Sequence, residues 1–148
     1  MGASASIFKG TIMPSNTKAT GVAYLDPEFS TMYATEEIGY ASAAQGTVTQ
    51  ATSKSTAVTL DKSAGRITMN NASLATATNA TFTLNNSTIS ANDTVILTIS
   101  GGQATAGSYN VFANALASGS VSITLRNISG GTLSEAVIIN FCVIHGQS

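Results

Sequence analysis

Residues that could perform acid–base, nucleophilic or metal chemistry are few in this sequence. It has one histidine, His145, one cysteine, Cys142, and seven acidic residues. The acidic residues are Asp26, Glu28, Glu36, Glu37, Asp61, Asp93 and Glu135. A metal site needs several converging ligands, and there is no second histidine and no cysteine pair. We therefore expect no metal site, no cofactor, and a structural or merely exposed role for His145.

We searched the sequence for two catalytic arrangements, a pair of carboxylates and the nucleophile motif of serine hydrolases. A pair of carboxylates could be formed among Asp61, Asp93 and Glu135, although both aspartates stand in turn-like contexts where aspartate is common. The Gly-X-Ser-X-Gly motif of serine hydrolases does not occur, and neither does a glycine-rich phosphate-binding loop. The sequence therefore predicts a protein that is not an enzyme. A hydrolase stays an alternative, to be tested by how far apart these three carboxylates lie.

The composition excludes further classes of partner. Charged residues make up 9% of the chain and the net charge is −1, whereas roughly 25% of an average soluble protein is charged. The lysines and arginines are scattered, and nucleic-acid binding needs them clustered, so we expect no nucleic-acid partner. No apolar run reaches the roughly 18 residues of a membrane helix, so we expect no membrane span. A weakly charged surface rich in Thr, Ser and Asn favours association and indicates a protein that works in an assembly.

The stretch from Val121 to Ile144 has the clearest strand pattern. Apolar and polar side chains alternate in residues 120–126, which is typical of a strand with one buried face. Residues 135–144 are apolar on both faces except at Asn140. Such a strand is expected to be covered on both sides, by a second sheet, by the N-terminal segment or by another subunit. Gly130-Gly131 is expected to turn the chain between them, which makes them the central pair of a β-sandwich.

Shorter alternating segments precede this pair. They are Thr47–Ala51, Thr56–Leu60, Arg66–Met69, Thr81–Leu84, Thr94–Ile99 and Ser108–Ala113. Ile67, Met69, Phe82, Leu84, Tyr109 and Val111 are expected to point inward. The spacing and the turn residues between the segments predict an all-β chain, an antiparallel β-sandwich or jelly roll of about eight strands.

The first 45 residues differ from this regular part. Two short apolar segments, 6–13 and 20–25, have strand character, and Asp26-Pro27-Glu28 resembles a helix start. Small residues follow from Ala41 to Gly46 and suggest a boundary. We expect an N-terminal arm at residues 1–45 and a β-sandwich domain at residues 46–148.

The N-terminal arm is rich in the side chains that carry interface energy. Its predicted interface residues are Phe8, Met13, Tyr24, Phe29, Met32 and Tyr33. Two compatible interpretations stay open: the arm packs over the open side of its own sandwich, or it docks on a neighbouring molecule.

Two runs of the sequence resemble a module of tailed-bacteriophage structural proteins. One is Gly46–Lys62 followed by Gly65–Met69, and the other is Ser118–Phe141. The resemblance covers about residues 46–144 and keeps the order of the motifs. Such modules occur in head and tail proteins alike. A short arm followed by one β-domain is similar in layout to a capsid decoration, or cement, protein.

This resemblance implies a non-enzymatic protein that binds the outside of a phage head and stabilises the shell. Its partner would be the phage major capsid protein, its favoured oligomer a homotrimer, and its place the virion, after synthesis in the cytoplasm of the host bacterium. The resemblance implies no catalytic residues. The alternative is a receptor- or glycan-binding tip of a head or tail fibre, which would show a cleft with exposed aromatic residues.

Overall fold

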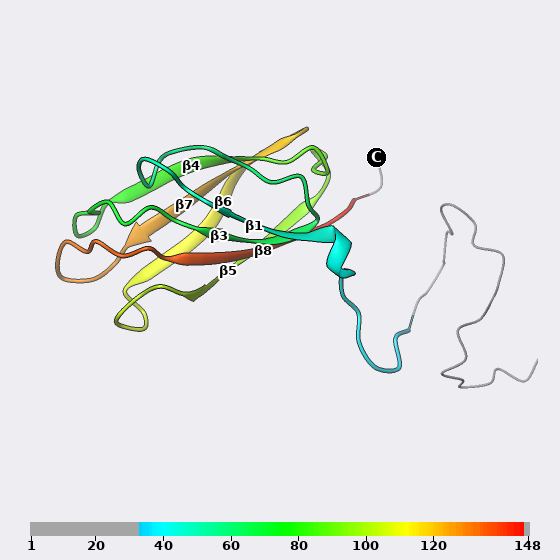
Figure 1. Ribbon diagram of the computed structural model, residues 1–148, viewed down its shortest axis with the longest axis horizontal. Coiled ribbons are helices and arrows are strands. Elements are labelled where there is room, and N and C mark those ends of the chain that lie inside the picture. The colour runs from blue at the N-terminus through cyan, green and yellow to red at the C-terminus, as the bar shows by residue number, and fades with distance from the viewer. Residues whose placement is uncertain (1–32, 147–148) are drawn as a thin grey trace, which may run out of the picture. The chain divides into compact units, whose positions relative to one another are not determined.

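The computed structural model describes residues 33–146. Contacts divide the chain into two units, Met1–Glu37 and Ile38–Ser148, and the regular structure described here belongs to the second. That unit is all-β, with eight strands and one short 3-10 helix, η1 (Ser42–Ala44) (Figure 1). The prediction of an all-β sandwich of about eight strands is confirmed. The expected helix start at Asp26–Glu28 lies outside the described residues.

The strands form two sheets of four. The strand bounds are β1 Gln45–Thr49, β2 Val58–Thr59, β3 Ala64–Thr68, β4 Asn79–Asn85, β5 Thr94–Gly101, β6 Tyr109–Ala117, β7 Ser120–Asn127 and β8 Ile138–Ile144. One sheet has the order β1-β3-β8-β5 and the other β2-β4-β7-β6. Each strand predicted from alternation is present, with ends that differ by a few residues.

Both sheets are mixed, whereas the sequence predicted antiparallel ones. β1 pairs in parallel with β3, and β2 pairs in parallel with β4. The cause is the path of the chain: it alternates between the two sheets from β1 to β6, so that β3 returns beside β1 in the same direction. The pairs β3-β8, β5-β8, β4-β7 and β6-β7 are antiparallel.

The predicted direct pairing of residues 120–126 with residues 135–144 is wrong. β7 and β8 lie in different sheets and face each other across the core. Gly131 belongs to the long connection between them, which the buried side chain of Asn127 holds by donating hydrogen bonds to the carbonyls of Leu74 and Gly131, at 2.9 and 2.8 Å. Leu133 then pairs with Leu74. Because the connection is fastened to the segment around Leu74, it crosses to the other sheet and does not turn back.

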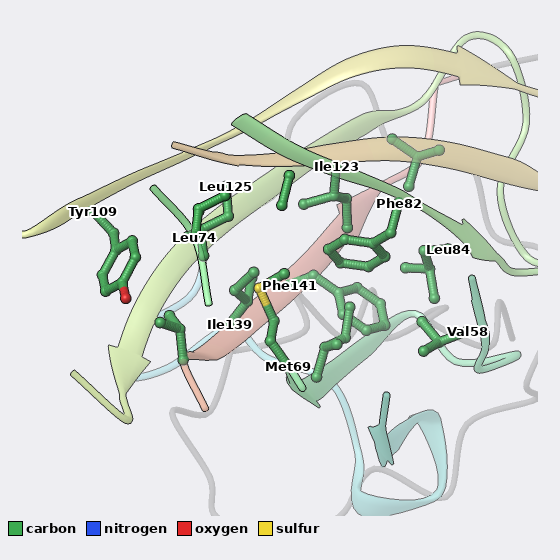
Figure 2. Close-up of a cluster of buried hydrophobic side chains, with 14 of the residues drawn as sticks. Val58, Met69, Leu74, Phe82, Leu84, Tyr109, Ile123, Leu125, Ile139 and Phe141 are labelled. Carbon is green, nitrogen blue, oxygen red and sulfur yellow. The ribbon is translucent and has the colours of Figure 1, made fainter. Parts of the chain in front are cut away.

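The core lies between the inner rows of the two sheets. Figure 2 shows Phe82 of β4 and Phe141 of β8 within this layer. Of the residues predicted to point inward, five are confirmed as buried: Ile67, Met69, Phe82, Leu84 and Tyr109. Val111 is partly buried and packs against the core. Truncating one of the large aliphatic side chains to alanine in such a core typically costs about 2–5 kcal/mol. Gly65 fits because a Cβ there would come within 2.8 Å of the side chains of Leu60 and Phe141.

The strand directions give the sandwich two different ends. We call one of them the entry end. There, residues 38–44 lead into β1 and β8 ends, and this end also contains the connections 60–63, 86–93 and 118–119. At the other, which we call the loop end, lie the longer connections 50–57, 69–78, 102–108 and 128–137. Figure 1 shows the cyan segment before β1 beside the red end of β8, with the loop end on the far side of the strands.

Candidate functional site

The carboxylates singled out from the sequence do not converge. Asp93 precedes β5 at the entry end, whereas Glu135 lies at the loop end, so the eight residues of β5 separate them, roughly 25 Å of strand. Asp61 also lies at the entry end, but it accepts a hydrogen bond from the amide of Ser87 at 2.7 Å and shares no partner with Asp93. Within residues 33–146 no cluster of three or more His, Cys, Asp or Glu side chains could hold a metal ion. The carboxylate pair on which the hydrolase alternative depended is therefore not formed by Asp93 and Glu135.

Asp93 fastens the end of the chain to the connection before β5. Its carboxylate accepts hydrogen bonds from the amide and the hydroxyl of Ser90, both at 2.8 Å, and from the amide of Gly146 at 3.0 Å. Nδ1 of His145 lies 3.0 Å from its Oδ2, and the Asp93 side chain is 1% exposed. The Ser90 amide, above all, holds the pKa of this carboxyl far below its usual range, against the opposing effect of burial. We call this group of residues the Asp93 clasp.

Two further contacts complete the entry end. A Cβ at Gly146 would approach the carbonyl oxygen of Asn92 to 2.2 Å, so only glycine allows the chain to lie this close. The hydroxyl of Tyr40 donates a hydrogen bond to the carbonyl of Val143. Burial raises the pKa of Tyr40, helped by the neighbouring Cys142 and Asp93. The incoming segment and the outgoing strand are thus fastened to each other.

Lys54 organises the loop end. It is 4% exposed, and its ammonium donates to the carbonyls of Asn70 and Glu135 at 2.6 and 2.5 Å. Burial lowers its pKa, while the negative charge of Glu135 opposes that shift. The side chain of Gln50 donates to the carbonyl of Lys54 and accepts from the amide of Asn70. One buried cation therefore joins three connections, residues 50–57, 69–78 and 128–137.

Glu135 extends this network to the remaining connection. Its Oε1 accepts a hydrogen bond from the amide of Ala104 at 2.7 Å. Burial, followed by the nearby Glu135 carboxylate, raises the pKa of Tyr109 to about 12. The atoms Gln103 Oε1, Tyr109 OH and Glu135 Oε2 are buried without a hydrogen-bond partner in the described part of the chain. Lys54, Gln50 and Glu135 hold the loops, since the side chain of each bonds to backbone groups of a neighbouring connection.

The outer face of β8 differs from the expectation that both faces are covered. The second sheet covers Val137, Ile139, Phe141 and Val143. On the outer face of the single chain, however, Ile144 is 53% exposed and Cys142 is a half-buried free thiol in register with Ile96. Cys142 therefore lies on the outer face of β8, which the sequence predicted to be covered.

Two of the hollows on the described surface lie over the sheets. One, of ≈ 500 Å³, lies over β1, β3 and β8 and is lined by Gln45, Gly46, Thr47, Ala64, Gly65, Arg66, Asn140 and Phe141. Its aromatic residue, Phe141, is buried, so this hollow lacks the exposed aromatic ring expected of a glycan-binding cleft. The other, of ≈ 260 Å³, lies between β5 and β6.

Most of the predicted interface residues lie outside the described range. These are Phe8, Met13, Tyr24, Phe29 and Met32. Tyr33 is described and is 89% exposed. The residues that fasten the two ends, Lys54, Asp93 and Tyr40, were not singled out for these roles, because a buried lysine in a Ser/Thr-rich loop has no signature in sequence.

Comparison with known proteins found no matching protein-family model, no similar curated protein and no similar solved structure. Between Tyr33 and Gly146 the structure contains no helix that is long and apolar enough to cross a membrane.

Proposed function

We propose that this chain is a capsid decoration protein of a tailed bacteriophage. In this role it is a non-enzymatic homotrimer that binds the major capsid protein on the outside of the head and stabilises the shell. The observation that carries the proposal is that the described residues of the β-domain form a core of their own. Among the described residues, the core is built from side chains between Val48 and Val143, and in our proposal the β-domain closes without the aromatic side chains of the N-terminal arm. Those side chains are then available for other molecules.

The two ends of the sandwich support this role. The chain enters the β-domain beside the end of β8, where Tyr40 bonds to Val143. An arm that grips the shell would therefore hold the entry end toward it and leave the loop end facing outward. The loop end is suited to exposure, because the Lys54 and Glu135 contacts fix its connections from within.

The mechanism is mass action. A protein that binds the assembled shell and not the separated subunits stabilises the shell by its binding free energy. Such a protein needs a stable fold and a contact surface, and it needs no catalytic group. The weakly charged composition fits a surface that is covered in an assembly.

The test compares phage particles with and without this protein. Particles that lack it should release their genome at a lower temperature, and adding back the purified protein should restore the higher one. Equal release temperatures would contradict the proposal. Imaging of labelled protein on the virion separates the alternative, because a fibre tip would place it at a fibre end, and the purified protein would then bind host cells.

A further inference from the structure

One side of the sandwich is formed by the edge strands β5 and β6 and is weakly protected. Within residues 33–146, β5 pairs with β8 alone and β6 pairs with β7 alone, so both strands are sheet edges on the same side. An edge strand presents unpaired N–H and C=O groups, and proteins usually protect it with charged residues, proline or bulges. Neither Thr94–Gly101 nor Tyr109–Ala117 contains a charged residue or a proline.

Of the two edges, β5 is the more regular. The pairing of β6 with β7 shifts between Ala113 and Ala115, in the middle of the strand. The pairing of β5 with β8 is regular from Thr94 to Ile99 and shifts only at Gly101. Ile96, in the centre of that stretch, is 46% exposed. The β5 edge is therefore the better template for an added strand.

A hollow lies beside this edge, between β5 and β6. It has a volume of ≈ 260 Å³ and is lined by Asp93, Thr94, Val95, Ala113, Asn114, Ala115 and Leu116. Ala113 pairs with the fully buried Ile123 in the ladder, yet Ala113 is exposed. Val95 and Leu116 pack against the core but are only partly buried. Since the Asp93 carboxylate is committed to the clasp, the hollow favours an uncharged, largely apolar side chain.

We propose that residues 20–25 of a neighbouring copy add a strand to the free edge of β5 and place Tyr24 in this hollow. These residues are uncharged, and their alternation puts Val22 and Tyr24 on one face. In an added strand, alternate side chains point toward the same layer as Val95 and Leu97. The other aromatic residues of the arm fit less well, because Phe8 is followed by Lys9 and Phe29 is preceded by Glu28.

The arm is long enough for this contact. Thirteen residues lead from Leu25 to Ile38 (38 − 25), which span up to roughly 40 Å when extended. The hollow includes Asp93 and so lies at the entry end, where Ile38 begins the β-domain. Each copy would give an arm to the next and receive one from the copy before. Such head-to-tail contacts form a ring when the rotation between copies closes. Three copies in a ring give the trimer of the proposed function, on which this inference rests.

Disulfide trapping tests the contact in the full chain. In a Cys142→Ser background, a Tyr24→Cys variant is mixed with an Ala113→Cys variant and oxidised. We expect a disulfide between position 24 of one copy and position 113 of another, identified by mass spectrometry. Thr47→Cys replaces Ala113→Cys in the control, because Thr47 is exposed on β1, at the opposite edge of the sheet that contains β5; it should not cross-link. Failure of the 24–113 bond, or equal trapping at position 47, overturns the proposal.

A second measurement distinguishes a neighbour from the same chain. The variant that carries both cysteines should give covalent oligomers without reductant, whereas a monomer with an internal 24–113 bond would overturn the contact between copies. Tyr24→Ala should lower the oligomer mass in sedimentation while the β-domain stays folded by circular dichroism, and an unchanged mass would also overturn the proposal. All of these measurements use purified protein without capsids. They can therefore fail while particle stabilisation succeeds, or succeed while it fails.

Discussion

Nδ1 of His145 lies 3.0 Å from Oδ2 of Asp93, which joins the residue that follows β8 to the residue that precedes β5. The two residues are 52 positions apart in the chain. With Ser90 and Gly146, they form the Asp93 clasp, so the last strand is fixed at its end as well as along its ladder. Since β8 is central in its sheet, its fixation affects β3 and β5 alike.

Replacing Asp93 by asparagine should destabilise the β-domain. An amide has one acceptor oxygen where the carboxylate has two, and its NH₂ group would face the donor amides of Ser90 or Gly146. Thermal unfolding of Asp93→Asn should show a lower midpoint. Asp61→Asn is the matched control, because Asp61 is exposed and bonds to the Ser87 amide at the same end. A control that loses as much stability would contradict the importance of the clasp.

The clasp also predicts the response to acid. The pKa of Asp93 is lower in the folded protein than in the unfolded chain, where it is about 4. Between these two values the unfolded state binds more protons, so stability rises with pH through this range. The contribution of Asp93 is fully present above about pH 4 and is lost as the pH falls toward the folded pKa. The unfolding midpoint of the native protein should fall as the pH is lowered across this range, and that of Asp93→Asn should change less; parallel profiles would refute the assignment.

At the loop end, Lys54→Ala should destabilise the protein by about 1–3 kcal/mol, the usual effect of leaving a buried polar group without its partner. The substitution leaves the carbonyls of Asn70 and Glu135 without their ammonium donor. Lys62→Ala serves as control, because Lys62 makes a single, exposed bond to the carbonyl of Ala43, and such surface changes usually stay within about 0.5 kcal/mol. Denaturant unfolding of both variants measures the difference, and similar losses would show that Lys54 is not the organising residue.

Alanine substitutions at two glycines with the same backbone conformation distinguish the cost of backbone strain from the cost of a steric clash. Gly102 and Gly119 have φ angles of +77° and +80°, so alanine at either adds about 1–2 kcal/mol of left-handed strain. At Gly102 a Cβ would also lie 2.0 Å from the carbonyl oxygen of Ala136, whereas at Gly119 it would meet nothing within 4 Å. Gly102→Ala should therefore lower the unfolding midpoint clearly more than Gly119→Ala. Equal effects would mean that the loop next to Glu135 moves aside easily.

Truncation tests the boundary between the arm and the β-domain. A chain that starts at Gln45 should fold as a soluble β-domain with reduced oligomerisation, because its core residues are retained. A chain that starts at Ile38 should be more stable, since it keeps the Tyr40 bond to Val143 and the Lys62 bond to Ala43. Circular dichroism and sedimentation measure both properties. If the shorter chain does not fold, the boundary at residue 45 is misplaced; if it assembles as well as the full chain, the arm is not the contact.

Local patterns predicted the strands because alternation records which side chains face the core. Ile67 and Met69, for example, are buried as their spacing indicates. The assignment of strands to sheets was not predictable in this way: the residues of β7 and β8 suit a hairpin as well as two facing strands, and the Asn127 contacts that decide between them are tertiary. The Asp93 clasp could not be predicted for the same reason. An aspartate before a strand and a histidine after a strand are each common, and nothing in the sequence shows that these two are in contact.

The fastening of Tyr40 to Val143 has a consequence for how the chain could be rearranged. It brings the first and last parts of the β-domain to the same end, so a short linker from Gly146 to Ile38 would close residues 38–146 into a ring without crossing either sheet. Chains whose termini are neighbours tolerate circular permutation. New termini opened in the exposed tip around Ala106 would leave every strand pair in place. In such a permutant, the N-terminal arm could be attached at the loop end, which would reverse the direction in which the β-domain is presented.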